Sequence, residues 1–164
     1  MPDFGVGLLL HFKQIKTIFS SYVGESEELF KQYQNGEIEM NLIPQGTLAE
    51  KIRAGGAGIP AFYTATGVST IEETGGFITK YKIGGKEPEK RSEMRPRAQF
   101  NNKNYILEES IKGDYSFVKA WKGDKEGNLV FDHSLWNFNG DVATAAKITI
   151  AEVYIGIIPN IFDY

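Results

Sequence analysis

Apolar and polar residues alternate in two different rhythms over the first 60 residues, and this predicts alternating helices and strands. Apolar side chains recur at helical spacing over residues 4–13. Residues 15–21 follow as a short run rich in Ile, Thr and Phe, which favours a strand. Helices and strands in alternation are typical of an α/β sheet with crossover helices.

The next segment has the signals of a helix at both ends. Ser26 is placed to cap its start, and the two glutamates that follow suit the positive end of a helix. Leu29 and Tyr33 belong to its apolar stripe. Asn35 and Gly36 both tolerate the left-handed conformation in which many helices end.

A strand and a third helix are expected after that turn. Residues 37–43 alternate polar and apolar side chains, which favours a strand. Pro44 begins the next helix, which we expect over residues 47–54. We expect Gly55 and Gly56 to stop it.

The middle of the chain has a weaker pattern. Residues 64–102 hold many Gly, Pro and charged residues, so we expect a long excursion with one strand near residues 77–83. A structureless loop of that length is uncommon in a domain. The excursion is therefore expected to pack on the rest of the chain or to fold around a ligand.

The last third of the sequence again has patterns that predict regular secondary structure. Strands are expected at residues 104–108, 115–121 and 148–155. A Gly-rich turn over residues 122–128 and a return strand at 129–131 predict a β-hairpin. Asp141 is expected to cap a helix of small residues over 142–146. The fold class predicted from all these elements is α/β: an open sheet with crossover helices, plus a β-hairpin region.

Composition and charge exclude several classes of protein. The chain has 164 residues, of which 41% are hydrophobic and 24% charged, as in an ordinary soluble domain. Its net charge is −3, and the basic stretch at 86–97 is interrupted by glutamates, so we expect a solvated loop there and no nucleic-acid partner. No apolar run reaches the length of a membrane span. With no cysteine, the chain has neither disulfide nor thiolate nucleophile.

The segment Pro44-Gln45-Gly46 is the best candidate for chemistry. It joins a strand to a helix at the carboxyl edge of the predicted sheet, where open α/β sheets bind their ligands. Gly46 permits a close backbone approach, and the amides that begin a helix can hold a carboxylate or a phosphate. The Gln45 side chain can donate to or accept from such a group. A capping or surface role for Gln45 is the alternative.

Other polar residues favour no site. His11 and His133 are too few and too far apart in sequence to indicate a metal site. Glu72-Glu73 and Glu108-Glu109 are adjacent pairs, whose members point to opposite faces of a strand. We therefore expect both pairs on the charged surface.

The run from Pro44 to Tyr63 resembles the first-half (A-type) domain of the family I CoA-transferases, most closely the succinyl-CoA:3-oxoacid CoA-transferases. Further stretches in the same order extend the resemblance over roughly residues 4–153. They include Ser20-Ser21-Tyr22-Val23-Gly24-Glu25, Tyr105-Ile106-Leu107-Glu108-Glu109, Val118-Lys119-Ala120-Trp121-Lys122 and Asn137-Phe138-Asn139.

The resemblance implies a CoA-transferase-like, Rossmann-like fold and a ping-pong transfer of CoA between carboxylic acids. A glutamate attacks the acyl-CoA, and a glutamyl-CoA thioester forms by way of a mixed anhydride. Gln45, Gly46 and Tyr22 are the implied substrate-binding residues; for Tyr22, a role bridging core and water is the alternative. The resemblance implies an acyl-CoA (coenzyme A) thioester and a small carboxylic acid as substrates, and no permanently bound cofactor.

The departures from the family concern its nucleophile and its first strand. The family's glutamate lies in a Ser-Glu-Asn-Gly motif of the second half, which this sequence lacks. The family's opening strand and Gly-rich loop precede the stretch that residues 3–7 resemble. We therefore expect residues 1–164 to be a single A-type domain, truncated at both ends, with no catalytic residue of its own and no activity alone.

A partner follows from these expectations. It is a B-type CoA-transferase half, in an enzyme of ketone-body metabolism, or other protein subunits. The alternative is a pseudoenzyme: a non-catalytic CoA-transferase-like subunit with a structural role in a larger mitochondrial assembly. The resemblance places the chain in the mitochondrial matrix, although its N-terminus has no targeting features, so an address is absent or has been removed.

Overall fold

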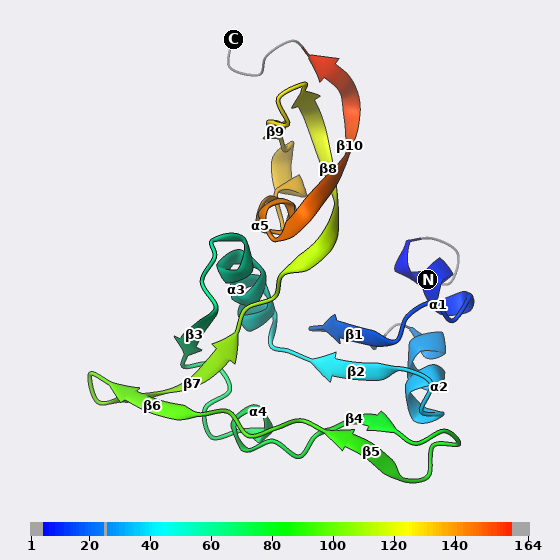
Figure 1. Ribbon diagram of the computed structural model, residues 1–164, viewed down its shortest axis with the longest axis vertical. Helices are drawn as coiled ribbons and strands as arrows, with labels where there is room; N and C mark the ends of the chain where they lie inside the picture. Colours follow the sequence, from blue (N-terminus) through cyan, green and yellow to red (C-terminus); the bar gives the residue numbers. More distant parts are fainter. Residues whose placement is uncertain (1–4, 25, 159–164) are drawn as a thin grey trace. The chain divides into compact units, whose positions relative to one another are not determined.

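Two short parallel strands, β1 (Thr17–Ser20) and β2 (Glu39–Leu42), belong to the first of two units into which the computed structural model divides (Figure 1). The structure describes residues 5–24 and 26–158. The first unit comprises Met1–Leu48 and Tyr63–Glu108, and the second comprises Ala49–Phe62 and Glu109–Tyr164. The prediction of one A-type domain over residues 1–164 stays a prediction.

The β1 and β2 strands are joined through a crossover helix, as the sequence predicts. The helix α2 (Glu27–Gln34) lies between them in the chain, and α1 (Val6–His11) precedes β1. Ser26 Oγ accepts a hydrogen bond from the Leu29 amide at 3.3 Å, which confirms the predicted cap of α2. The core of this part consists of Leu10, Leu29, Tyr33, Ile38 and Met40.

The helix α3 (Gln45–Gly56) begins two residues earlier and ends two residues later than predicted. Gly55 and Gly56 lie inside it, so the expectation that they stop the helix is wrong. A Cβ at Gly55 would overlap the carbonyl oxygen of Ile111, and these glycines therefore serve close packing. The turn that follows the helix contains Gly58, where φ is +74° and the amide bonds to the Gly55 carbonyl at 3.2 Å.

The middle of the chain holds more regular structure than predicted. The expected strand near residues 77–83 is confirmed as β4 (Ile78–Tyr81). The excursion also contains α4 (Ile71–Thr74), β5 (Pro88–Arg91) and β6 (Arg97–Phe100). The expectation of a solvated loop at 86–97 is wrong where β5 pairs antiparallel with β4. All four residues of β5 are exposed, so the strand has no apolar alternation by which to predict it.

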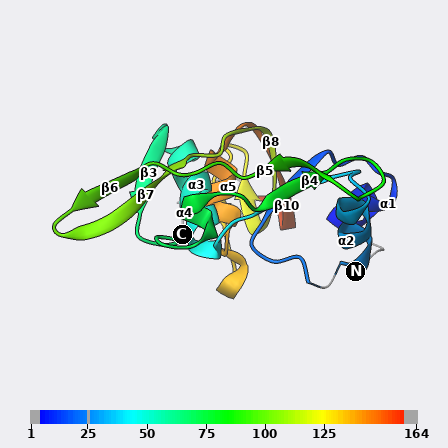
Figure 2. The same ribbon diagram turned by 90° about the horizontal axis from the view of Figure 1, so that it is seen from below.

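The β4–β5 hairpin runs beside α2 in both views of the fold (Figures 1 and 2). The Tyr33 hydroxyl donates a hydrogen bond to the Ile78 carbonyl oxygen and so joins α2 to β4. A separate sheet has the strand order β3-β7-β6, with β3 at Ala61–Thr64 and β7 at Lys103–Glu109.

The second unit contains the predicted hairpin and a second parallel pair. β8 (Gly113–Asp124) pairs antiparallel with β9 (Leu129–Val130) and parallel with β10 (Ala146–Ile158). A short 3-10 helix, η1 (His133–Leu135), and α5 (Asn139–Thr144) connect β9 to β10. Because helices and strands combine in open sheets with parallel crossovers, the predicted α/β fold is confirmed.

The start of α5 differs from the prediction. Asp141 lies in the first turn, and Phe138 occupies the cap position without a side-chain hydrogen bond. The chain enters α5 directly from a turn, and the Asn139 amide bonds to the Trp136 carbonyl at 2.8 Å. A backbone carbonyl of that turn thus satisfies the amide of the first helical residue, and Asp141 does not act as the cap.

Candidate functional site

The loops that follow β1 and β2 leave the sheet at the same edge. Ser20 and Leu42 are register partners at the ends of the two parallel strands. The Ile43 amide extends the pairing with a 2.9 Å hydrogen bond to the Ser20 carbonyl oxygen. Tyr22 comes two residues after β1 and Gln45 three residues after β2. The structure therefore brings both predicted residues to the carboxyl edge, where open α/β sheets bind ligands.

Gln45 is the first residue of α3, and its side chain is exposed. The Leu48 amide closes the first turn of the helix with a 2.9 Å hydrogen bond to the Pro44 carbonyl. The space beside Gly46 is open, since apart from its chain neighbours and the backbone of its own helix no atom lies within 4 Å of the position that a Cβ would occupy. First-turn amides have no partner within their helix. A carboxylate can therefore approach this turn and meet both its amides and the Gln45 amide group.

Tyr22 is held by a small turn and is 70% exposed. The Ser20 hydroxyl donates to the Tyr22 carbonyl oxygen at 2.8 Å and accepts from the Tyr22 amide at 3.3 Å. The phenol lies against Gly24, where a Cβ would come within 2.8 Å of the Tyr22 hydroxyl oxygen. Gly24 therefore permits this position of the ring.

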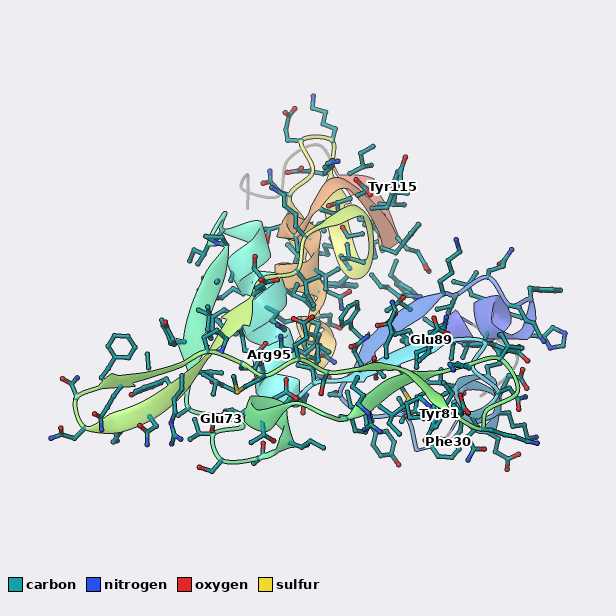
Figure 3. All side chains as sticks on the ribbon, turned by 60° about the horizontal axis from the view of Figure 1, so that its bottom comes forward. Phe30, Glu73, Tyr81, Glu89, Arg95 and Tyr115 are labelled. Atoms are coloured by element: carbon teal, nitrogen blue, oxygen red, sulfur yellow. The ribbon has the colours of Figure 1, made fainter. Side chains whose placement is uncertain are left out.

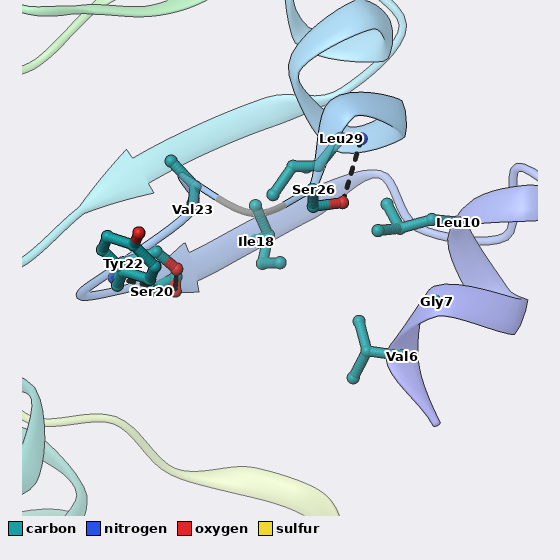
Figure 4. Close-up of a pocket in the computed structure, with 9 residues that line it drawn as sticks. All are labelled: Val6, Gly7, Leu10, Ile18, Ser20, Tyr22, Val23, Ser26 and Leu29. Atoms are coloured by element: carbon teal, nitrogen blue, oxygen red, sulfur yellow. Dashed lines mark hydrogen bonds between the residues drawn. The ribbon is translucent and has the colours of Figure 1, made fainter. Parts of the chain in front are cut away.

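A cavity of about 260 Å³ lies beside β1 in the first unit and includes Tyr22 in its wall (Figure 4). Its other lining residues come from α1, from β1, from the loop between β1 and α2, and from the start of α2. Gln45 and Gly46 are not among the residues that line it. The predicted site residues thus share a sheet edge, with Tyr22 inside the cavity wall and Gln45 and Gly46 outside it.

A cluster of ion pairs in the first unit was missed by the sequence reasoning (Figure 3). Glu108 is fully buried and Glu73 is 8% exposed, so the expectation that both pairs lie on the surface is wrong. Arg95 Nε lies 3.4 Å from Glu108 Oε1, and Arg97 Nη1 lies 3.2 Å from Glu73 Oε1. The sequence contained a sign that Glu108 is buried. Glu108 follows the buried Ile106 by two residues, so the two side chains share one face of β7.

The described part of the chain offers neither a metal site nor a membrane span. Within residues 5–24 and 26–158, no three His, Asp or Glu side chains gather as a metal site requires. None of the described helices is long and apolar enough to cross a membrane.

Comparison with protein families gives one match, a model described as coenzyme A transferase, over residues 1–155. The chain is 46% identical over 159 residues to the A-type subunit of the probable succinyl-CoA:3-ketoacid coenzyme A transferase of Mycobacterium tuberculosis, covering 97% of this chain and 64% of the relative. It is 51% identical over 153 residues to the A-type subunit of the Helicobacter pylori J99 transferase, covering 93% of this chain and 58% of the relative.

A third relative is the human succinyl-CoA:3-ketoacid coenzyme A transferase 2, mitochondrial, at 48% identity over 153 residues, with 93% of this chain and 29% of the human protein covered. The chain thus spans less than two thirds of the length of these curated relatives.

Two solved structures share the fold. An acyl-CoA transferase of Escherichia coli O157:H7, in a thioester complex with CoA, superposes with a TM-score of 0.78 at 21% identity, covering 99% of this chain and 33% of that one. Glutaconate coenzyme A-transferase from Acidaminococcus fermentans superposes with a TM-score of 0.68 at 15% identity, covering 95% of this chain and 52% of that one. At these identities the likeness concerns the fold alone.

Proposed function

This chain belongs to the coenzyme A transferase family, and from that premise we propose that it is the A-type half of a 3-oxoacid CoA-transferase. It binds the carboxylic acid, and a complementary B-type half supplies the nucleophilic glutamate. The names of the bacterial relatives, which are A-type subunits of succinyl-CoA:3-ketoacid transferases, support this assignment.

The proposed reaction exchanges CoA between succinate and acetoacetate. The glutamate carboxylate attacks the thioester carbonyl of succinyl-CoA, and the CoA thiolate leaves while a mixed anhydride forms. The thiolate then attacks the glutamyl carbonyl, which releases succinate and gives the glutamyl-CoA thioester. Acetoacetate then attacks the glutamyl-CoA thioester, the CoA thiolate leaves and a second mixed anhydride forms. The thiolate attacks the acetoacetyl carbonyl of this anhydride, which releases acetoacetyl-CoA and restores the glutamate.

The observation that carries the proposal is the convergence of two loops at one sheet edge. Tyr22 and Gln45 follow adjacent parallel strands, joined at their ends by the Ile43 amide and the Ser20 carbonyl. The exposed Gln45 amide and the open space beside Gly46 suit a carboxylate that must stay accessible to a second chain.

The test is reconstitution with a B-type half. We expect the chain, mixed with the B-type half of the Helicobacter pylori enzyme, to transfer CoA from succinyl-CoA to acetoacetate. Gln45→Ala is expected to lower kcat/KM by about 100-fold, because a positioned donor to a reacting carboxylate contributes about 2–4 kcal/mol. Steady-state kinetics of acetoacetyl-CoA formation measure the loss.

Gln34→Ala is the matched control. Gln34 is an exposed glutamine at the end of α2, so its loss should leave kcat/KM unchanged. A chain that forms a complex with the B-type half and transfers no CoA would contradict the proposal and would favour the structural, non-catalytic alternative.

The mitochondrial matrix is part of this proposal. The human and mouse relatives are named mitochondrial, whereas bacterial relatives of similar identity come from cells without mitochondria. Fractionation of the source cells with an antibody to the chain tests the location, and recovery in the cytosolic fraction would contradict it.

A further inference from the structure

The two faces of the parallel pair β8 and β10 differ in what covers them. α5 packs against one face (Figure 1), where the Ser116 hydroxyl donates to Thr149 Oγ1 at 2.9 Å. The Thr149 hydroxyl in turn donates to the Ala143 carbonyl oxygen of α5 at 2.6 Å. Ser116, Val118 and Ala120 are buried on this face. Because side chains alternate along a strand, the residues between them lie on the opposite face.

The opposite face carries large apolar side chains that no other part of the described chain covers. Tyr115 and Phe117 of β8 are 62% and 73% exposed, and Tyr154 of β10 is 81% exposed. Ile148 and Ile150 of β10, the register partners of Tyr115 and Phe117, are 50% and 48% exposed. We call these five residues the apolar face. Parallel strands are ordinarily buried on both faces, so this exposure indicates a binding surface.

An ion pair lies within the apolar face. Lys119 and Glu152 are register partners, two residues beyond Phe117 and Ile150 on their strands. Lys119 Nζ lies 2.8 Å from Glu152 Oε1, and the two side chains are 57% and 73% exposed. The face therefore presents one positive charge on β8 and one negative charge on β10, at the same level.

This arrangement is complementary to itself. Sheets that pack face to face keep their strands nearly aligned. If a two-fold axis runs along the strands, midway between β8 and β10, then β8 of each copy lies over β10 of the other in the same direction. Lys119 then faces Glu152 of the second copy, and the aromatic residues of β8 face its isoleucines. A two-fold axis across the strands would instead oppose like charges or bury them against apolar residues.

The apolar face is large enough for a dimer. A buried aromatic residue contributes about 150–250 Å². At the exposures of Tyr115, Phe117 and Tyr154, these side chains offer roughly 400 Å² in each copy and roughly 800 Å² in a pair. The isoleucines and the ion pair raise the buried area above the roughly 1,000 Å² that a biological interface needs.

We propose that the apolar face of β8 and β10 is the contact surface for a second copy of this chain. The two copies pack face to face about a two-fold axis along the strands, and the charges of Lys119 and Glu152 fix their register. The surface is independent of the proposed transferase function, since β8 and β10 belong to the second unit whereas Tyr22 and Gln45 belong to the first.

Sedimentation equilibrium of the full chain tests the contact. We expect a dimer at about 100 μM, because interfaces of standard size have dissociation constants in the micromolar range or below. Phe117→Lys should raise the dissociation constant at least about 100-fold, because both copies lose a buried ring. Phe12→Lys is the matched control and should leave it unchanged, since Phe12 is 66% exposed and lies outside the apolar face. Both variants should keep the circular dichroism spectrum of the wild type.

The ion pair allows a second test, which separates contact between copies from folding. Lys119→Glu leaves two negative charges on each face and Glu152→Lys leaves two positive charges, so each variant alone should be monomeric. An equimolar mixture of the two should form a heterodimer, because each charge on one face then meets an opposite charge on the other. Native mass spectrometry, with one variant isotopically labelled, identifies the heterodimer.

A monomeric wild type at about 100 μM would overturn the inference. So would a dimer that Phe117→Lys leaves intact, or a mixture of the two charge variants that stays monomeric. If Phe117→Lys weakens only the binding of the B-type half, the apolar face contacts that half, and a second copy is not its partner.

Discussion

Gly55 lies in the last turn of α3, where its missing side chain leaves room for the Ile111 backbone. We predict that Gly55→Ala lowers the free energy of unfolding by about 2 kcal/mol, because the methyl group must displace a backbone carbonyl. Gly46→Ala is the control, because the space beside Gly46 is open. It should leave stability unchanged or raise it by up to about 1 kcal/mol. Urea denaturation measures both, and equal stabilities would contradict the packing role of Gly55.

Tyr33 is a buried phenol whose titration couples to folding. Burial, and then the neighbouring Tyr81, raise the pKa of Tyr33 to about 12. Between pH 10 and 12 the unfolded chain loses this proton while the folded chain keeps it, so stability is complete below pH 10 and falls as the pH rises. We predict that the titration of Tyr33 lowers the free energy of unfolding by roughly 2 kcal/mol between pH 10 and pH 12.

Tyr33→Phe isolates this contribution. The variant loses the hydrogen bond to the Ile78 carbonyl and should be about 1 kcal/mol less stable at pH 7. Its stability should fall less steeply than that of the wild type between pH 10 and 12, as followed by urea denaturation at each pH. Identical slopes in the two proteins would show that Tyr33 does not titrate with folding.

At the scale of elements, Arg95 ties α4 to β7. Its guanidinium lies 3.6 Å from Glu72 on α4 and 3.4 Å from the fully buried Glu108 on β7. We predict that Arg95→Met lowers the free energy of unfolding by about 3 kcal/mol, because a buried carboxylate loses a cationic neighbour. Denaturation monitored by circular dichroism measures the change.

The control for Arg95 is an arginine in an exposed pair. Arg53 and Glu50 form an i,i+3 pair on α3, in which the two side chains are 48% and 37% exposed. Arg53→Met should lower the free energy of unfolding by less than about 1 kcal/mol. A similar loss in the two variants would mean that the burial of Glu108 does not make its ion pair stronger.

Elements with an amphipathic pattern were predictable and those without one were not. β1, α2 and β2 follow from apolar spacing, and Ser26 caps α2 as its residue type predicts. β5 consists of Pro88, Glu89, Lys90 and Arg91, all exposed, and it exists because it pairs with β4. Pairing between strands depends on the partner strand, which a local pattern does not contain.

At the scale of the whole molecule, binding to a B-type half should stabilise the chain. A partner that binds only the folded state adds about 2.7 kcal/mol at a concentration about 100 times its Kd. We predict that the Tm of the chain rises with the concentration of the B-type half and not with that of an unrelated protein. Differential scanning fluorimetry gives the Tm, and a constant value across the titration would contradict the proposed partnership.

The sequence by itself determined the α/β class, the positions of the patterned elements and the resemblance to the CoA-transferases, because side-chain periodicity and short motifs are local properties. Only the tertiary structure decided that Gly55 serves packing, that Glu108 is buried, and that Tyr22 lines a cavity while Gln45 reaches the same sheet edge from the next strand. Each of these depends on residues far apart in the chain, whose contacts form when the elements pack.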